Sequence, residues 1–139
     1  MALMKLRQAL VVGCGEFGMR VADKLSDKGY SVTVVDRDAH AFDGLSTAFG
    51  GETILADGTD VAVLEDCGLK RADVFAACTD RDSVNYFLAR VASEVYGIEH
   101  VFARIEDEDL IGLLEESIVE AICPHRLCLD AFCQALRLS

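Results

Sequence analysis

Short apolar runs alternate along the chain with stretches in which apolar residues recur at helical spacing. Runs rich in valine, isoleucine and leucine predict buried strands at 8–12, 31–35, 52–55, 73–78, 100–105 and 118–123. Helical periodicity predicts helices at 16–28, 82–96, 109–116 and 124–138. We expect two more helices, one capped by Asp38 with Phe42, Leu45 and Phe49 inward, and a short one capped by Thr59 or Asp60.

Six strands that alternate with helices predict an α/β fold with a parallel sheet covered on both faces. Right-handed crossovers between parallel strands make such a sheet doubly wound. We therefore expect one Rossmann-like domain over residues 1–139, with the strand order 3-2-1-4-5-6.

The junction between the first strand and the first helix carries three glycines in the segment VVGCGEFG. Gly13 permits a tight turn, Gly15 lets a pyrophosphate approach the backbone, and Gly18 allows the helix to pack close to the strand. Unpaired N–H groups at the helix N-terminus favour phosphate. Met19 and Arg20 stand where an ATP-hydrolysing P-loop needs Lys and Ser or Thr, so that chemistry is not expected.

An acidic residue ends the second strand, as dinucleotide-binding folds require. A carboxylate at Asp36 accepts hydrogen bonds from both ribose hydroxyls and repels a 2′-phosphate, which favours NAD or an adenosine nucleotide over NADP. Arg37 is a neighbouring cation that weakens this discrimination. The alternative is that Asp36 merely caps the following helix.

Composition narrows the classes of partner. The 139 residues are 52% hydrophobic and carry a net charge of −11, with 13 basic against 24 acidic residues, which argues against a nucleic-acid partner. No apolar run approaches the roughly 20 residues of a membrane span, so we expect no direct membrane insertion. The first ten residues are too short and mixed for a signal peptide, and we expect a cytoplasmic protein.

Cysteine and histidine patterns predict neither a metal site nor a catalytic centre. The six cysteines form no CxxC pair, and Cys123, Cys128 and Cys133 do not share one helical face. The three histidines join no recognisable triad. Cys14 lies at a helix N-terminus, a position expected to lower its thiol pKa and to allow a redox role. The simpler interpretation is that a small residue fits the turn.

Three further segments complete a family resemblance: LADGTD at 55–60, ACTDRDSVN at 77–85 and VFARIED at 101–107. Together with VVGCGEFG they resemble the RCK domain, which regulates potassium conductance and is also called the KTN or TrkA N-terminal domain. The resemblance implies a Rossmann-like domain that dimerises and binds NAD(H) or adenine nucleotides. It implies a partner as well, a membrane potassium channel or Trk/Ktr uptake transporter that such domains gate as dimers or rings.

The resemblance assigns roles by position. Asp36 would hold the ribose, Asp57 would lie beside the adenine, and Arg104 would steady phosphate or the partner subunit. Cys78, Thr79 and Asp80 would line the pocket. The expected binding residues are Gly13, Cys14, Gly15, Glu16, Phe17, Gly18, Asp36, Arg37, Asp57, Gly58, Cys78, Thr79, Asp80 and Arg104.

Two departures from the family pattern shape the expectation. Many relatives carry arginine where this chain has Glu16, so NAD or AMP is favoured over ATP, although Arg81 or Arg104 could compensate. Relatives commonly continue into a smaller C-terminal ligand domain, which leaves open whether this chain is a stand-alone subunit or an excised domain.

The last predicted helix is apolar around nearly its whole circumference. A helix on the surface of one domain has one apolar stripe, so we expect a second subunit to cover the other side of 124–138. The resemblance implies the same, because in that family the equivalent helix crosses over to a neighbouring subunit. The alternative is a terminal helix buried in its own domain.

Three functions compete. The first is a non-enzymatic regulatory domain whose ligand shifts the inter-subunit geometry and so gates a potassium transporter. The second is an NAD-dependent oxidoreductase or its nucleotide-binding fragment, which needs a substrate region beyond the nucleotide fold. The third is a dimeric redox or nucleotide sensor without a membrane partner.

Overall fold

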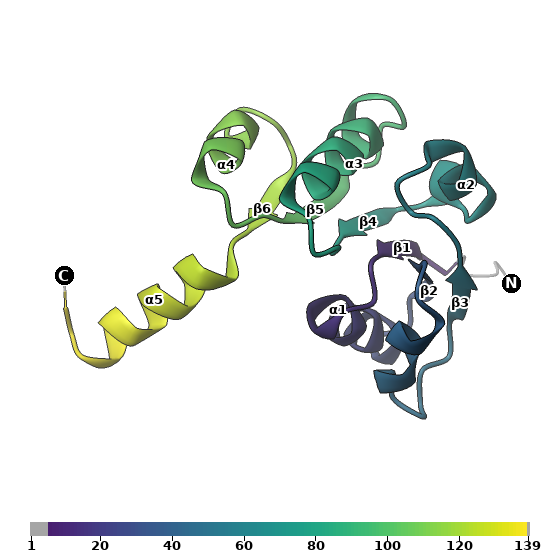
Figure 1. Cartoon of the computed structure of the whole chain (residues 1–139), viewed down its shortest axis with the longest axis horizontal. Helices are drawn as coiled ribbons and strands as arrows, with labels where there is room; N and C mark the ends of the chain where they lie inside the picture. The colour runs from purple at the N-terminus through teal and green to yellow at the C-terminus, as the bar shows by residue number, and fades with distance from the viewer. Residues whose placement is uncertain (1–5, 139) are drawn as a thin grey trace, which may run out of the picture.

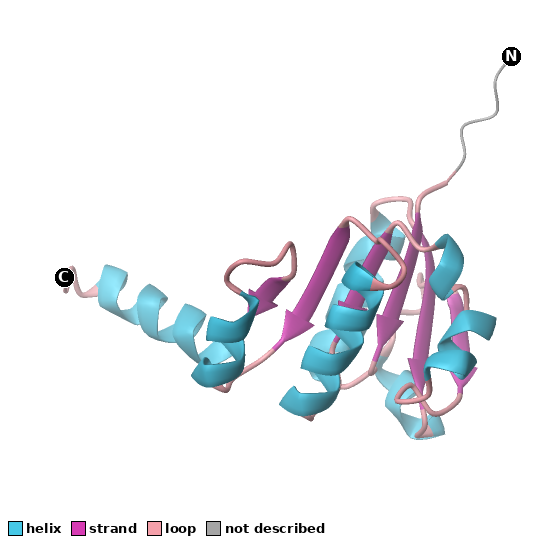
Figure 2. Ribbon diagram, turned by 90° about the horizontal axis from the view of Figure 1, so that it is seen from above, coloured by secondary structure: helices cyan, strands magenta, loops and turns pink. Residues whose placement is uncertain are grey.

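A six-stranded parallel sheet organises the computed structural model, which describes residues 6–138. The strands are β1 (Gln8–Val12), β2 (Ser31–Asp36), β3 (Glu52–Leu55), β4 (Val74–Ala77), β5 (His100–Arg104) and β6 (Glu120–Ile122). Their order is β3-β2-β1-β4-β5-β6, and every neighbouring pair is parallel, which confirms the predicted topology (Figure 2).

Helices cover both faces of this sheet (Figure 1). The helices of the chain are α1 (Glu16–Asp27), α2 (Val61–Asp66), α3 (Asp82–Glu94), α4 (Glu108–Leu114) and α5 (Pro124–Ala135), with short 3-10 helices η1 (Ala39–Gly44) and η2 (Leu69–Arg71). The α1 and η1 segments lie on one face, and α2, α3 and α4 lie on the other. No helix between residues 6 and 138 has the length and apolar character needed to span a bilayer.

The apolar runs of the central strands follow from burial on both faces. Ala9 and Val11 of β1 pack in the cluster under α1, whereas Leu10 and Val12 pack in the cluster under α2, α3 and α4. All four side chains are at most 3% exposed. A strand covered on both sides has no solvent-facing positions, so its sequence shows no polar alternation.

The segment after β2 corrects one predicted helix. Asp38 does cap it, accepting the His40 N–H at 3.0 Å, but the element is a 3-10 helix that ends at Gly44. Side chains of α1 hold the following loop instead: the Asp23 carboxylate accepts the Ser46 N–H at 3.1 Å, and the Ser26 hydroxyl accepts the Gly50 N–H at 3.0 Å. These bonds take the place of further helical turns.

Helix α5 projects past β6, away from the sheet (Figures 1 and 2). None of its residues is buried, and Leu127, Leu129 and Phe132 are each more than half exposed. The alternative of a terminal helix buried within its own domain is therefore wrong.

Candidate functional site

A cleft of about 890 Å³ lies along the carboxyl ends of the central strands. It spans the topological switch point between β1 and β4, where the order of the strands reverses direction. This point is the usual ligand site of an open α/β sheet. The turns after β1, β2, β3 and β4 supply most of the lining. The start of α1, Arg104 of β5, and Pro124 and Cys128 of α5 are among the other contributors.

The glycine turn after β1 forms the wall of the cleft nearest the switch point. Gly13 has φ +97°, and a Cβ there would lie 2.7 Å from the Cys78 carbonyl carbon and the Thr79 nitrogen. A Cβ on Gly18 would overlap the Gly13 carbonyl oxygen. Gly15 faces open space, with no atom within 4 Å of its Cβ position. The turn thus packs against β4 on one side and leaves its backbone bare toward the cleft on the other.

Asp36 joins the glycine turn to the end of β2. Its Oδ2 accepts the Cys14 N–H at 2.8 Å, and its Oδ1 accepts the Asp38 N–H at 2.9 Å. An ionised carboxylate has about four acceptor sites, so two backbone bonds leave capacity for further donors. The proposed capping role belongs to Asp38, which is the N-cap of η1, while Asp36 lines the cleft.

Asp57 lies on the β3 side of the cleft in a tight local hydrogen-bonded turn. Its Oδ1 accepts the Thr59 hydroxyl at 2.6 Å and the Thr59 N–H at 2.9 Å. These two bonds, aided by the positive charge of Arg37, lower the pKa of the Asp57 carboxyl. Asp60, not Thr59, caps α2 by accepting the Ala62 N–H at 3.0 Å.

Asn85 fixes the other end of the cleft, where β4 and β5 end. It is the one fully buried polar side chain within residues 6–138. Its Oδ1 accepts the Thr79 hydroxyl at 2.6 Å and the Thr79 N–H at 3.0 Å, and its Nδ2 donates to the carbonyls of Thr79 at 3.0 Å and Arg104 at 2.7 Å. One side chain therefore sets the spacing of the β4 and β5 ends.

Charges of both signs surround the cleft. Its arginines are Arg20, Arg37, Arg81 and Arg104, and its acids are Glu16, Asp36, Asp38, Asp57 and Asp80. The exposed pair Glu16–Arg20 is 3.5 Å apart, one turn along α1. Arg104 Nη2 donates to Glu106 Oε1 at 3.1 Å. The mixed rim suits a ligand of moderate negative charge.

The pKa of the Cys14 thiol is shifted in the direction opposite to that expected from its position at a helix N-terminus. Burial, with the negative charges of Asp36 and Asp23, raises the Cys14 pKa to about 11. Burial also raises the Cys78 pKa to about 12. The prediction of a lowered Cys14 pKa is therefore wrong, because the cost of burying a thiolate beside carboxylates outweighs the helix terminus. The structure fits the simpler interpretation of a small residue in the turn.

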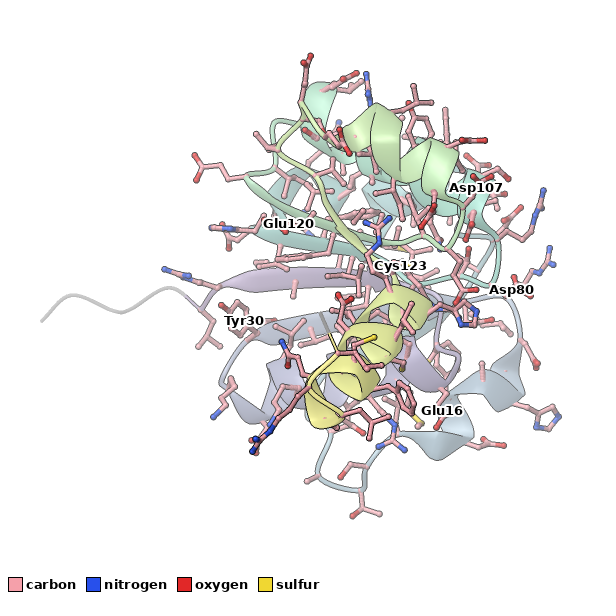
Figure 3. All side chains as sticks on the ribbon, turned by 90° about the vertical axis from the view of Figure 1, so that its left-hand side faces the viewer. Glu16, Tyr30, Asp80, Asp107, Glu120 and Cys123 are labelled. Carbon is pink, nitrogen blue, oxygen red and sulfur yellow. The ribbon has the colours of Figure 1, made fainter. Side chains whose placement is uncertain are left out.

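Most of the predicted binding residues come together in this cleft. The residues that line it are Gly13, Gly15, Glu16, Phe17, Asp36, Arg37, Asp57, Gly58, Cys78, Thr79, Asp80 and Arg104. The other two, Cys14 and Gly18, lie behind the turn. Gly18 packs against Gly13, and Cys14 meets Asp36 through its backbone. In Figure 3, Glu16 and Asp80 carry labels that locate the α1 and β4 sides of this region.

Sequence reasoning missed several members of the cleft. Arg20 could have been found, since it stands four residues after Glu16 on the same helical face. Pro124 and Cys128 enter through the placement of α5, which local sequence does not encode. The three histidines lie outside the cleft lining. Within residues 6–138, no three His, Cys, Asp or Glu side chains are grouped as a metal would require.

Comparison with known proteins identifies the family. The TrkA-N domain model matches residues 9–124. The chain belongs to the TrkA-N domain family. The Trk system potassium uptake protein TrkA of Streptomyces coelicolor is 40% identical to it over 98 residues, which cover 70% of this chain and 44% of that protein. A TrkA homolog of Pyrococcus abyssi is 31% identical over 107 residues, which cover 77% of this chain and 47% of that protein.

Solved structures share the fold of this TrkA-N domain. The TrkA-N domain of the inner membrane protein ybaL from Escherichia coli superposes with a TM-score of 0.81 at 16% identity, covering 96% of this chain and 99% of that one. The AMP-bound Kef C-terminal domain of Shewanella denitrificans gives a TM-score of 0.73 at 18% identity, covering 94% and 80%. The GsuK RCK domain gives 0.64 at 22% identity, covering 83% and 25%. The chain spans less than half the length of the TrkA proteins described above.

Proposed function

We propose that the cleft binds NAD(H) or an adenine nucleotide, and that this binding regulates a potassium uptake transporter or channel. One observation carries the proposal: the bare backbone of Gly15 and the carboxylate of Asp36 face the same cleft at the switch point of the sheet. The first suits a phosphate group and the second suits a ribose. The potassium uptake relatives and the AMP-bound Kef domain support the choice of ligand and partner.

The ligand lies across the mouth of the sheet. Its adenosine half rests on the β2 and β3 side, where Asp36 accepts the ribose hydroxyls and Asp57 and Gly58 lie beside the adenine. Its phosphates meet the glycine turn and the N-terminus of α1. A second nucleotide half, where present, reaches Thr79, Asp80 and Arg104. In this placement the backbone N–H groups bind the phosphates, and the side chains select the ribose and the base.

Glu16 disfavours a third phosphate. It is the first residue of α1 and lines the cleft beside Gly15, so its carboxylate faces the region that the phosphates occupy. Arg20 lies 3.5 Å from that carboxylate and offsets part of its charge. The remaining repulsion grows with the charge of the ligand, which ranks NAD and AMP above ATP.

Regulation requires a second subunit. The exposed apolar side chains of α5 form a contact between two copies of the chain, and each ligand state favours one arrangement of the pair. Motion of the paired domains is passed to a membrane potassium transporter or channel from its cytoplasmic side. The protein performs no catalysis in this account, and no side chain of the cleft supplies the histidine acid or base common in oxidoreductases.

Isothermal titration with NADH, NAD, AMP, ADP and ATP tests the binding proposal. The wild-type chain should bind NADH, NAD or AMP more tightly than ATP, and a ligand at 100 times its Kd should add about 2.7 kcal/mol to the free energy of unfolding. Asp36→Ala should abolish binding. Asp60→Ala removes a carboxylate that accepts a backbone N–H outside the cleft lining, and this variant should bind as wild type does. Equal binding by both variants would refute the ribose assignment.

A further inference from the structure

Glu106 pairs with one residue that lines the cleft and with one residue of the helix that leaves the domain. Its Oε1 lies 3.1 Å from Nη2 of Arg104, which lines the cleft. Its Oε2 lies 2.9 Å from Nε2 of His125, in the first turn of α5. One carboxylate thus contacts the two elements through separate oxygens. In Figure 3 the yellow helix α5 begins beside Cys123, with Asp107 marking the start of α4.

The backbone around Glu106 is held in place by α3. The Asp82 Oδ2 accepts the N–H groups of Glu106 at 3.1 Å and Asp107 at 2.7 Å. The Ile105 N–H donates to the Ile122 carbonyl at 2.9 Å, which joins the same loop to β6. The Glu106 side chain is 31% exposed and Arg104 is 30% exposed, so solvent screens this pair only in part. The backbone that carries this carboxylate is therefore held in place between α3 and β6.

We propose that Glu106 is a positioning residue that couples a ligand in the cleft to the seating of α5, meaning the position in which His125 lies against Glu106. This inference rests on the proposed function. In the free protein, Arg104 and His125 share the carboxylate of Glu106. An anionic ligand draws Arg104 toward itself and leaves the charge of Glu106 less neutralised. That charge then attracts His125 and the positive N-terminus of α5 more strongly.

Coupling of this kind is reciprocal. If the ligand strengthens the seating of α5, then the seated α5 must strengthen binding of the ligand by the same factor. A partner that pulls α5 away leaves Glu106 to pair with Arg104 alone, and the ligand then competes with a stronger ion pair. Ligand binding in the cleft and the seating of α5 are thereby coupled in one equilibrium, and the fold of the sheet does not change.

A double-mutant cycle on the full chain tests the coupling. The readout is the Kd of NADH or AMP, whichever binds the wild-type chain more tightly. Glu106→Gln frees Arg104 and should tighten binding about two- to fivefold, the range for loss of a partly exposed ion pair. His125→Ala leaves Glu106 entirely to Arg104 and should weaken binding about twofold. The double variant should bind like Glu106→Gln alone, because His125 acts only through Glu106.

Glu108→Gln is the matched control. It removes the same charge two residues away and breaks the 3.1 Å pair between Glu108 and Arg126 in the same turn of α5, but Arg126, unlike Arg104, does not line the cleft. Its Kd should equal that of the wild-type chain. His125 is 82% exposed, so its replacement leaves folding intact even if Glu106→Gln does not.

Three results would overturn the inference. The first is an equal shift of Kd in Glu106→Gln and Glu108→Gln, which would reduce the effect to net charge. The second is a His125→Ala variant that binds as wild type does. The third is weakening by His125→Ala that persists in the Glu106→Gln background. If the wild-type chain binds no nucleotide, the proposed function and this inference fail together; if it binds but these shifts are absent, only the inference fails.

Discussion

The backbone N–H of Cys14 donates a hydrogen bond of 2.8 Å to the carboxylate of Asp36, 22 residues away along the chain. This bond joins the glycine turn after β1 to the end of β2. The Gly13 N–H adds a second link by donating to the Val35 carbonyl at 2.8 Å. Asp36 therefore shapes the turn that would receive phosphate and, in the same cleft, presents the acid that would receive ribose.

Removing this carboxylate should cost stability as well as binding. Asp36→Ala leaves the N–H groups of Cys14 and Asp38 without their acceptor, and we expect the free energy of unfolding to fall by about 2 kcal/mol. Asp60→Ala removes a single N-cap bond and should cost about 1 kcal/mol. Urea denaturation monitored by circular dichroism measures both. If Asp36→Ala is as stable as wild type, the carboxylate is not a structural brace.

Gly15, the N-cap of α1, and Gly18, in the first turn of α1, should respond differently to alanine. Gly18→Ala places a methyl group against the Gly13 carbonyl, so we expect a loss of about 1–3 kcal/mol of stability. Gly15→Ala meets no atom within 4 Å, and its φ of −71° suits alanine. Its stability should therefore stay within about 0.5 kcal/mol of wild type.

Nucleotide binding, unlike stability, should change in Gly15→Ala. Its added methyl group occupies the space through which a phosphate approaches the backbone, so nucleotide binding should weaken although the protein remains fully folded. Thermal melting and titration of the two variants give both quantities. Loss of stability in Gly15→Ala, or unchanged binding, would contradict the assignment of this residue to the phosphate site.

The buried thiols should make the protein sensitive to alkaline pH. The Cys14 pKa is raised from its ordinary value near 9 to about 11, and those of Cys67 and Cys78 are raised as well. Above pH 9 the unfolded chain releases thiol protons that the folded chain keeps, so the free energy of unfolding falls as pH rises toward 11. Below pH 9 these thiols contribute no pH dependence.

Urea denaturation across this pH range measures the effect. Cys14→Ala removes one of the three groups, and its stability should decline less steeply than that of the wild-type chain between pH 9 and 11. A parallel decline in both proteins would mean that the Cys14 thiol ionises with equal ease in the folded and unfolded states.

The exposed apolar face of α5 should hold two copies of the chain together. Phe132 is 57% exposed, and Phe132→Glu places a charge in the proposed contact, so we expect a dimer to become a monomer. Leu55 on the edge strand β3 is 60% exposed, and Leu55→Glu should leave the dimer intact. Analytical ultracentrifugation at micromolar concentration measures both. A wild-type chain that is monomeric there would refute the contact.

Local sequence predicted the parts of this protein that short-range rules control. The buried strands follow from continuous apolar runs, and the glycine turn follows from backbone positions that a Cβ would obstruct. The family resemblance supplied Asp57 and the residues after β4. The pattern after Asp38 predicts a helix that extends to Phe49, whereas the 3-10 helix ends at Gly44, and Asp23 and Ser26 of another element hold the loop that follows.

Asn85 and Glu106 show what such rules miss. Each has partners in elements that are distant along the chain, and their roles appear only when those elements are placed together. The predicted direction of the Cys14 pKa shift is wrong for a similar reason. A helix N-terminus can be read from sequence, whereas the burial and the neighbouring carboxylates that outweigh it cannot.

A crystal structure of the chain grown with NADH, and with AMP in a parallel crystal, tests the central claim most directly. The account predicts electron density in the cleft at the ends of β1, β2 and β4, with ribose hydroxyls against the Asp36 carboxylate and phosphate over the backbone of Gly15. Density for the nucleotide at another surface, while this cleft stays free of it, would contradict the account.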